Sequence, residues 1–330
     1  LMDANTGEIL AMSSLPDFDP NNRPHILTEG FESDSPLFNR AVQGVYELGS
    51  TFKPFTVAQA LELKLVEPET LIDTRGPLLW GKFKIRDFRD YGPELSVEKV
   101  IVKSSNIGTA RIAQIIGNER QKAFLDRLGM LAATPIELIE GPTGRPQYPD
   151  NWSEISTMTI SYGHGISTSP LHLAAGYATI INGGTLVTPT LLKQNIRKVG
   201  KRIVSEKVSQ EIRTMLRHVV TDGTARSGDV PGYFVGGKTG TADKPSPKGG
   251  YYEDKVLATF AGIFPSHDPK YVLVVTLDEP EDLRGPEPRR TASVTAVPVA
   301  AEVIRRIAPL LGLAPQAERK HQMDMTLAKK

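Results

Sequence analysis

The sequence predicts an α/β fold: an antiparallel sheet lobe, flanked by helices and completed by both ends of the chain, with an inserted all-helical lobe. Through the middle of the chain, apolar residues recur at helical spacing. After Asp222 the spacing becomes that of strands, with three consecutive antiparallel candidates at 233–241, 255–264 and 270–277. The chain also begins in strand-like sequence, at 1–4 and 8–12.

These periods divide the chain into two lobes. We expect the sheet lobe at about 1–49 and 230–314 and the helical lobe at about 65–225. A chain of 330 residues, 39% hydrophobic and 23% charged, is ordinary for a soluble globular protein and can form one large domain or two. The lysine-containing segment 315–330 is expected to be a disordered tail.

In chain order, a loop rich in Pro, Asp and Asn is predicted at 15–37. The clearest helix is 170–181, because Ser169 can cap it and Pro170 occupies its first position. The other helices are predicted at 50–65, 97–102, 108–116, 118–128, 205–220 and 294–311. A loop is predicted at 141–152.

Composition excludes several functions. A formal net charge of +1 argues against a dedicated nucleic-acid binder, which would carry a basic face. Zero cysteines exclude disulfides, thiolate chemistry and cysteine-based metal sites. The longest apolar run, 271–277, is far shorter than the roughly 20 residues of a membrane helix. Since the chain starts inside a strand-like segment without an initiator methionine, we expect it to be an excised fragment.

A hydroxyl and an amine, those of Ser50 and Lys53, stand three residues apart at the start of the helix predicted at 50–65. Gly49 permits a turn conformation barred to other residues, and Ser50 is a good residue to begin a helix. Side chains at i and i+3 project from one helix face, so the amine can reach the hydroxyl. The pair has the outline of an activated nucleophile.

Ser-x-x-Lys alone is a weak pattern, because segment 96–99 matches it too. There Ser96 caps a helix and Glu98 lies in its first turn, so we interpret that copy as a plain helix start.

A second candidate motif, Ser104-x-Asn106, lies in a polar turn between two helices and can aim short polar groups at a cleft. The alternative is a helix connection rich in capping residues.

The third motif is the glycine-rich segment 236–241, which we interpret as a strand where another backbone or a ligand approaches closely. A phosphate-binding loop is the alternative, because Gly232, Gly237, Lys238 and Thr239 satisfy its pattern. That loop must open a helix. The prolines that follow, at 245 and 247, make a helix unfavourable.

In this order, Ser50-x-x-Lys53, Ser104-x-Asn106 and Lys238-Thr239-Gly240 resemble the signature of the penicillin-binding protein and serine β-lactamase superfamily. Segments 39–41, 47–50, 161–163, 168–171 and 278–280 further resemble class B transpeptidases of the cell-division type. The resemblance runs from Leu1 to about Leu313. It implies a β-lactamase/transpeptidase-like fold, a transpeptidase domain at 1–314, and a parent protein whose membrane anchor and pedestal domain are absent here.

Acyl transfer by a serine needs a base, because a serine hydroxyl is a poor nucleophile at neutral pH. Lys53 is the best-placed candidate, provided that its pKa falls by about 3 units from about 10.4. Burial and a neighbouring cation lower a lysine pKa, and Lys238 would be that cation if its strand borders the same cleft. The resemblance implies that Ser104 passes protons to the departing amine and that Asn106 orients Lys53 and the substrate amide.

Strand alternation places Lys238 and Gly240 on one face and Thr239 and Thr241 on the other, so a site that uses all four lies along the strand's open edge. The Thr241 and Ser50 backbone N–H groups are candidates for an oxyanion hole. Lys238 and the two threonine hydroxyls suit a substrate carboxylate, and a peptide strand can add to the edge.

Aromatic residues are expected at the rim of the cleft. The resemblance places Tyr162 and His164 among the substrate or β-lactam contacts, with His164 standing where related chains often have a second tyrosine. Segment 243–254 is interpreted as a mobile flap whose Tyr251 and Tyr252 cover a ligand. The alternative is that these are exposed loop aromatics without a role.

The resemblance implies a peptidoglycan D,D-transpeptidase that cross-links stem peptides at the division septum through a serine acyl-enzyme and is acylated by β-lactams. It implies that no metal, cofactor or nucleic acid is bound. It also implies that the parent protein has divisome membrane proteins as partners and lies at the periplasmic face of the inner membrane. Alternatives are a D,D-carboxypeptidase, a β-lactamase, or a non-catalytic penicillin-binding sensor or divisome scaffold.

Overall fold

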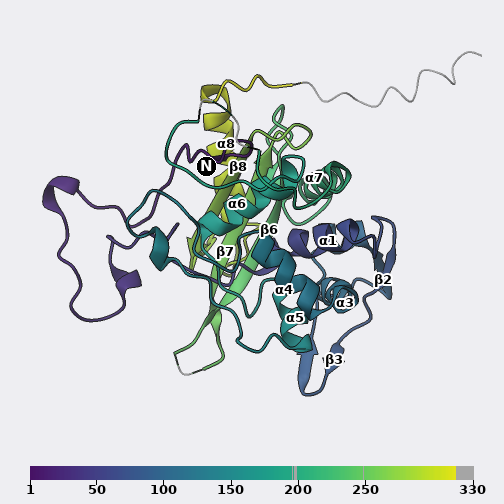
Figure 1. Cartoon of the computed structure of the whole chain (residues 1–330). Coiled ribbons are helices and arrows are strands. Elements are labelled where there is room, and N and C mark those ends of the chain that lie inside the picture. The colour runs from purple at the N-terminus through teal and green to yellow at the C-terminus, as the bar shows by residue number, and fades with distance from the viewer. Residues whose placement is uncertain (195, 197–198, 248, 317–330) are drawn as a thin grey trace, which may run out of the picture.

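The fold is built on an antiparallel sheet with the strand order β1-β8-β7-β6 (Figure 1). In the computed structural model, which describes residues 1–194, 196, 199–247 and 249–316, these strands are Met2–Asp3 (β1), Gly236–Pro245 (β6), Tyr251–Phe264 (β7) and Tyr271–Asp278 (β8). Met2 pairs with Val272, so the N-terminal strand joins the C-terminal ones, as predicted. The expected tail lies outside the described residues from position 317 on.

The helices follow the predicted apolar spacing closely, and the predicted α/β class is confirmed. Ser169 caps α6, which begins at Pro170 as expected, and Ser96 caps α2 through the Lys99 N–H. The helices are Lys53–Glu62 (α1), Val97–Lys103 (α2), Asn106–Ile116 (α3), Asn118–Arg127 (α4), Glu154–Ile160 (α5), Pro170–Ile181 (α6), Glu206–Thr221 (α7) and Ala296–Leu310 (α8).

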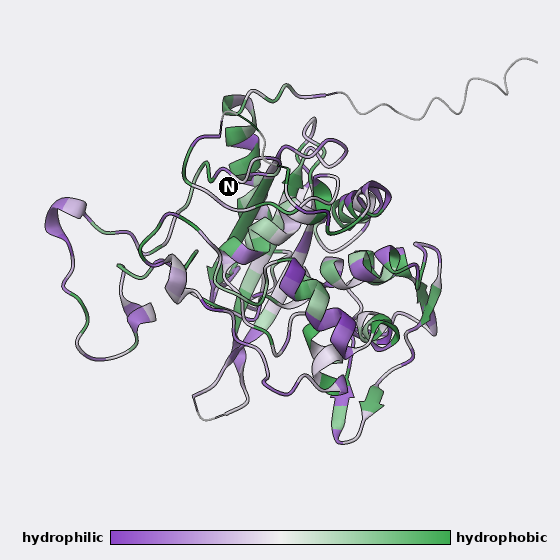
Figure 2. Cartoon of the chain, in the orientation of Figure 1, coloured by the Kyte–Doolittle hydropathy of each residue, from purple (hydrophilic) through white to green (hydrophobic). Residues whose placement is uncertain are grey.

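Helices cover both faces of the sheet. On one face, α6 contacts β7 and β8 while α7 contacts β6, although the sequence analysis had assigned both helices to the middle lobe. On the other face Phe260 of β7 and Val297 of α8 both border Gly228. Figure 2 shows apolar residues concentrated in β8 and α6, where these layers meet.

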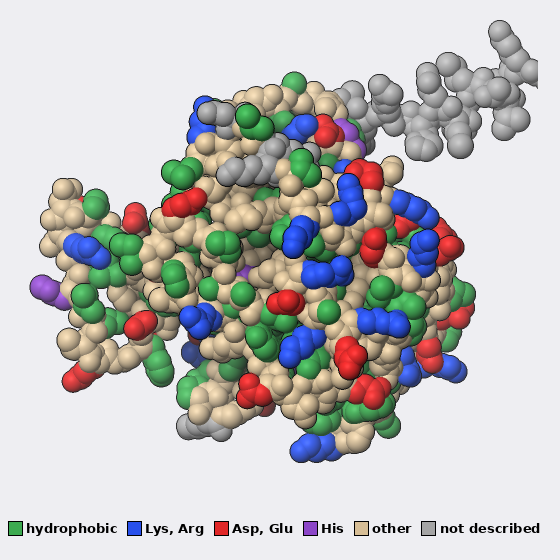
Figure 3. All heavy atoms as spheres, viewed as in Figure 1, with side chains coloured by type: hydrophobic (Ala, Val, Ile, Leu, Met, Phe, Trp, Pro, Cys, Tyr) green, Lys and Arg blue, Asp and Glu red, His purple; other side chains and the backbone are tan. Residues whose placement is uncertain are grey.

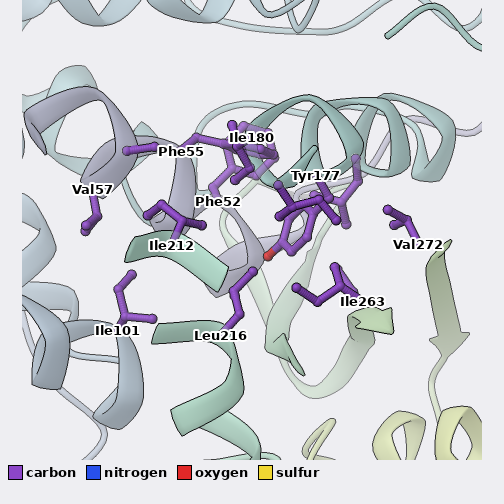
Figure 4. Close-up of a cluster of buried hydrophobic side chains, with 14 of the residues drawn as sticks. Phe52, Phe55, Val57, Ile101, Tyr177, Ile180, Ile212, Leu216, Ile263 and Val272 are labelled. Carbon is purple, nitrogen blue, oxygen red and sulfur yellow. The ribbon is translucent and has the colours of Figure 1, made fainter. Parts of the chain in front are cut away.

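The main core connects the sheet to the helices that carry the candidate site. Figure 4 shows Tyr177 of α6 above Ile263 of the sheet, with Phe52 and Phe55 to its left. Phe55 makes edge-to-face ring contacts with Phe52 and Tyr177, at centroid distances of 5.4 and 5.5 Å. All three rings are almost completely buried, so the segment around residues 50–55 is held by packing on several sides.

The middle of the chain contains short strands as well as helices. Leu71–Asp73 (β2) pairs with Glu94–Ser96 (β5), and Leu78–Trp80 (β3) pairs with Phe83–Ile85 (β4). Spacing could not predict three-residue strands, because a period of two needs a longer run to be recognised. Helix α5 was also missed, since it spans only seven residues, three of which are Ser or Thr, residues of modest helix propensity.

Two segments differ in extent from the predicted strands. Within 243–254, β6 continues to Pro245 and β7 begins at Tyr251, and these two residues pair across an irregularity between Asp243 and Pro245, while the role of this segment as a mobile flap stays a prediction. Segment 8–12 forms only isolated bridges, Met2 with Ile9 and Glu8 with Thr190. The predicted loop at 15–37 is a loop with short 3-10 turns, and it projects from the body in Figure 1.

The surface agrees with the small net charge. On the face shown in Figure 3, basic and acidic side chains are interspersed rather than gathered into a basic patch. Within the ranges that the structure describes, no helix has the length and apolar character needed to cross a membrane.

Candidate active site

Ser50 lies in a 3-10 turn, Gly49–Phe52, that leads directly into α1. Leu48 occupies the N-cap position, so the prediction that Ser50 itself begins the helix was wrong by two residues. Gly49 has φ +57°, the left-handed conformation predicted for it. The Lys53 N–H donates to the Ser50 carbonyl, which places the two residues one turn apart as expected.

Neighbouring elements hold this turn by close contacts. The Tyr177 hydroxyl donates to the Thr51 carbonyl (2.8 Å), and the Thr51 hydroxyl donates to the Leu48 carbonyl (2.9 Å). A Cβ at Gly240 of β6 would lie 2.2 Å from the Leu48 oxygen, so only glycine permits this approach. The predicted close approach at the glycine-rich strand is therefore an approach to the Ser50 turn.

Tyr177→Phe is expected to lower the free energy of unfolding by about 0.5–1.5 kcal/mol, the net contribution of one hydrogen bond. The substitution keeps the buried ring and removes only the donor to Thr51. Urea unfolding measures the change. Tyr148→Phe is the matched control, since that hydroxyl is exposed and makes a weak 3.5 Å contact; equal stability losses in the two variants would contradict the account.

Lys53 is completely buried and donates to three oxygens on the turn between α2 and α3. They are the Ser104 carbonyl (2.6 Å), the Ser104 hydroxyl (3.1 Å) and Asn106 Oδ1 (2.8 Å). Ser104 adopts a left-handed conformation with φ 65°, which turns its carbonyl and hydroxyl toward the amine. No hydrogen bond joins Lys53 Nζ to Ser50 Oγ among the described contacts. A neutral Lys53 amine has a lone pair that can accept the Ser50 proton. Hydrogen bonds between catalytic groups often tighten only when substrate is bound.

Lys238 reaches the same hydroxyl from the sheet. Its completely buried Nζ donates to Ser104 Oγ (2.8 Å) and to the Thr239 carbonyl (3.1 Å). Burial lowers the pKa of Lys238 to about 7. Burial and the nearby Lys238 charge hold the pKa of Lys53 well below its usual value. Lys238 can therefore be neutral near pH 7, Lys53 gives up its proton more readily than an ordinary lysine, and Ser104 links the two amines.

The threonines of β6 lie as alternation predicts. Lys238 and Gly240 face the Ser104 and Ser50 turns, while Thr239 and Thr241 point to the other face. There the Thr239 hydroxyl pairs with Thr224 (2.7 Å), and Thr241 Oγ1 accepts the Ala292 N–H (3.0 Å). β6 is the edge strand of the sheet, and a Cβ at Gly49 would lie 3.3 Å from the Thr241 carbonyl. Thr241 thus adjoins the Ser50 turn.

Tyr162 and His164 lie in a cluster that Tyr251 completes. The rings of Tyr162 and His164 stack at 6.4 Å, and the His164 and Tyr251 rings are 4.8 Å apart. Burial raises the pKa of Tyr162 to about 12. Tyr252, also expected to cover a ligand, lies instead beside the Lys255 ammonium, 5.2 Å from its ring centroid.

The sequence analysis missed the carboxylate at the centre of this cluster. Glu47 accepts the Gly165 N–H (2.7 Å) and the Tyr251 hydroxyl (3.1 Å), and its Oε2 lies 3.2 Å from His164 Nδ1. Its place in segment 47–50, three residues before Ser50, was the available signal, but nothing in the sequence indicated its partners. Among the described residues, no cluster of three or more His, Asp and Glu side chains is suited to a metal ion.

Comparison with known proteins identifies a family that this chain matches over most of its length. Residues 1–305 match the family described as the penicillin binding protein transpeptidase domain. The chain belongs to this family. The class assigned from the sequence, a class B penicillin-binding protein of the cell-division type, is confirmed by the relatives that it matches.

Two curated relatives and one solved structure illustrate the similarity of this transpeptidase domain. A probable peptidoglycan D,D-transpeptidase FtsI of Caulobacter vibrioides is 37% identical over 95% of the chain and 54% of that protein. The penicillin-binding protein PbpB of Mycolicibacterium smegmatis is 33% identical over 93% of the chain and 49% of that protein. The chain thus spans about half the length of these relatives.

The solved structure is the apo transpeptidase domain of Burkholderia pseudomallei penicillin-binding protein 3. It is 33% identical with a TM-score of 0.82, covering 96% of this chain and 88% of that one. This agreement over nearly the whole of both chains shows that the predicted transpeptidase-like fold is the fold of this domain.

Proposed function

We propose that this chain is the catalytic domain of a peptidoglycan D,D-transpeptidase that cross-links stem peptides during septal cell-wall synthesis. One observation carries the proposal: two completely buried lysines, Lys53 and Lys238, share the Ser104 hydroxyl beside the turn that presents Ser50. This arrangement supplies a neutral amine, a second cation and a proton path at one serine, as acyl transfer requires.

In the proposed acylation, Ser50 Oγ attacks the carbonyl carbon of the D-Ala-D-Ala bond while neutral Lys53 accepts its proton. The carbonyl oxygen gains negative charge, and the backbone N–H groups of Ser50 and Thr241 stabilise it. The contact between Gly49 and the Thr241 carbonyl supports this pairing, because it brings the two segments together.

The tetrahedral intermediate then collapses by breaking the carbon–nitrogen bond. The leaving D-Ala nitrogen takes a proton from Ser104 Oγ, and Ser104 regains one from Lys53 or Lys238. Both Nζ atoms lie within hydrogen-bond distance of that hydroxyl, at 3.1 and 2.8 Å. Asn106 Oδ1 keeps Lys53 in place during the transfer.

The acyl-enzyme is resolved by an amine of a second stem peptide, which attacks the Ser50 ester and yields its proton to the neutral lysine. A β-lactam follows the first step only, because its ring nitrogen stays attached to the acyl group after the amide opens. It is then expected to remain on Ser50 as a covalent adduct.

Substrate recognition is proposed along the outer edge of β6. A donor peptide can add there as an antiparallel strand, with its terminal carboxylate near Lys238 and the hydroxyls of Thr239 and Thr241. Because both hydroxyls already have partners in this structure, they would need to rotate to serve the carboxylate. Tyr162 and His164 are proposed to border the other side of the substrate.

For the whole protein we propose stem peptides and β-lactams as ligands, divisome membrane proteins as partners, and the periplasmic face of the inner membrane as the location. The curated relatives named as peptidoglycan D,D-transpeptidases support these assignments.

The proposed reaction is tested with a peptide that ends in D-Ala-D-Ala and a D-amino acid as acceptor. Mass spectrometry should find released D-Ala and a peptide that carries the acceptor in its place. A peptide ending in D-Ala-L-Ala is the control and should not react. Hydrolysed peptide alone would indicate a carboxypeptidase. Penicillin labelling without any peptide turnover would indicate a sensor.

A further inference from the structure

Asp87, which the sequence analysis did not select, lies two residues after β4 and contacts the turn between α2 and α3. Its Oδ1 accepts the backbone N–H groups of Asn106 (2.5 Å) and Ile107 (3.0 Å). Its Oδ2 accepts the Ser105 hydroxyl (2.6 Å). One carboxylate from a different hairpin thus binds three consecutive residues: the middle and last positions of the Ser104-x-Asn106 motif and the residue that follows it.

We propose that Asp87 is a positioning residue for acyl transfer: it holds the turn 104–106 so that Ser104 and Asn106 meet Lys53. This inference rests on the proposed function, since it assigns a role within the same reaction. Asp87 makes none of the described hydrogen bonds to Lys53, Lys238 or Ser50, so it acts through the residues that do.

The backbone of the turn explains why outside support is needed. Ser104 holds a left-handed conformation, which costs a residue other than glycine roughly 1–2 kcal/mol. Helix α3 then begins at once, with N–H groups that lack partners within the helix. Asp87 accepts the first two, from Asn106 and Ile107, and the Ser105 hydroxyl accepts that of Gly108 (2.9 Å).

The side chain of Asn106 is oriented from the same hairpin. Its Nδ2 donates to the carbonyl of Arg86 (3.0 Å), the residue before Asp87. With Nδ2 directed to Arg86, Oδ1 is left to accept from Lys53 Nζ (2.8 Å). Residues 86–87 therefore fix both the backbone and the amide of Asn106, and the amide fixes Lys53.

The charge of Asp87 has a separate effect. The charged groups that act on Lys53 are Lys238, which lowers its pKa, and Asp87, which raises it against the larger effect of burial. A neutral residue at position 87 therefore leaves the Lys53 pKa lower still. This gives a readout that a purely structural role would not move.

The test is the rate of acylation by benzylpenicillin across pH in two variants of the 330-residue chain. Asp87→Ala removes every contact, and its rate at the high-pH plateau should fall by about 10- to 100-fold, as displaced catalytic groups cost. The amide of Asp87→Asn keeps an oxygen that can accept the Asn106 and Ile107 N–H groups, and its NH₂ group can donate to the Ser105 hydroxyl. This variant should restore most of the rate while the midpoint of the pH profile moves to lower pH.

Asp90→Ala is the matched control, because this exposed neighbour bonds only the Gly92 N–H among the described contacts. It should acylate as the wild type does. A folded Asp87→Ala variant that acylates within twofold of wild type overturns the inference. Should Asp87→Ala fail to fold, Asp87→Asn decides: an unmoved pH midpoint overturns it. A wild-type chain that is not acylated at all would contradict the proposed function instead.

Discussion

Replacing Ser50 with alanine is expected to abolish covalent labelling by benzylpenicillin while leaving the fold intact. The hydroxyl is the only atom lost, and no hydrogen bond to it occurs among the described residues. Because Leu48 rather than Ser50 occupies the N-cap, the substitution removes no cap. The turn stays fixed by Tyr177 and by the packing of Phe52. Intact-mass analysis measures the label, and a urea unfolding curve measures the fold.

Ser96→Ala is the control for this prediction, since Ser96 begins the second Ser-x-x-Lys copy. Its hydroxyl accepts the Lys99 N–H as a helix cap, so the variant should lose about 0.5–2 kcal/mol of stability and keep its labelling. The two serines should therefore show opposite effects, one on chemistry and one on stability. Labelling of Ser50→Ala at near the wild-type rate would refute the assignment of the nucleophile.

Replacing Lys53 with arginine should reduce acylation by roughly 10²- to 10⁴-fold, the usual contribution of a positioned base. Guanidinium stays protonated over the accessible pH range, so the variant keeps a cation and loses the base. Lys53 is completely buried against Ser104 and Asn106, and the larger side chain must be accommodated there. Circular dichroism and an unfolding curve establish that the variant is folded.

An electrostatic role for Lys53 predicts a different result. If the amine only attracts negative charge, a folded Lys53→Arg variant should acylate within a few-fold of wild type. That outcome would remove Lys53 as the base and direct attention to Lys238, whose burial lowers its pKa to about 7 and which bonds the same Ser104 hydroxyl.

The parts of the site that lie close together in sequence were predictable. The spacing of Ser50 and Lys53, the alternation of residues 238–241 and the cap of α6 all follow from local geometry, and the structure has each of them. Strand order was partly predictable too, since strand sequence at both ends of the chain indicated one sheet.

The parts that depend on distant contacts were not predictable. Asp87 reaches Ser105 across 18 residues, and Tyr251 reaches Glu47 across 204. Neither pairing leaves a periodic pattern. The partners of Thr239 and Thr241 on the far face of β6 are also set by tertiary packing. The ends of β6 and β7 that reach into 243–254 were not predicted as strand, because the prolines and glycines there outweighed a strand signal that depends on pairing.

The pH dependence of acylation by benzylpenicillin tests the central claim, a neutral Lys53 that activates Ser50, most directly. The neutral amine is the active form, so the rate should rise with pH and level off above the lowered pKa. The midpoint belongs to the coupled Lys53–Lys238 pair and should lie well below the ordinary lysine value of about 10.4. A rate that falls with increasing pH, or that is still climbing at about pH 10, would contradict the account.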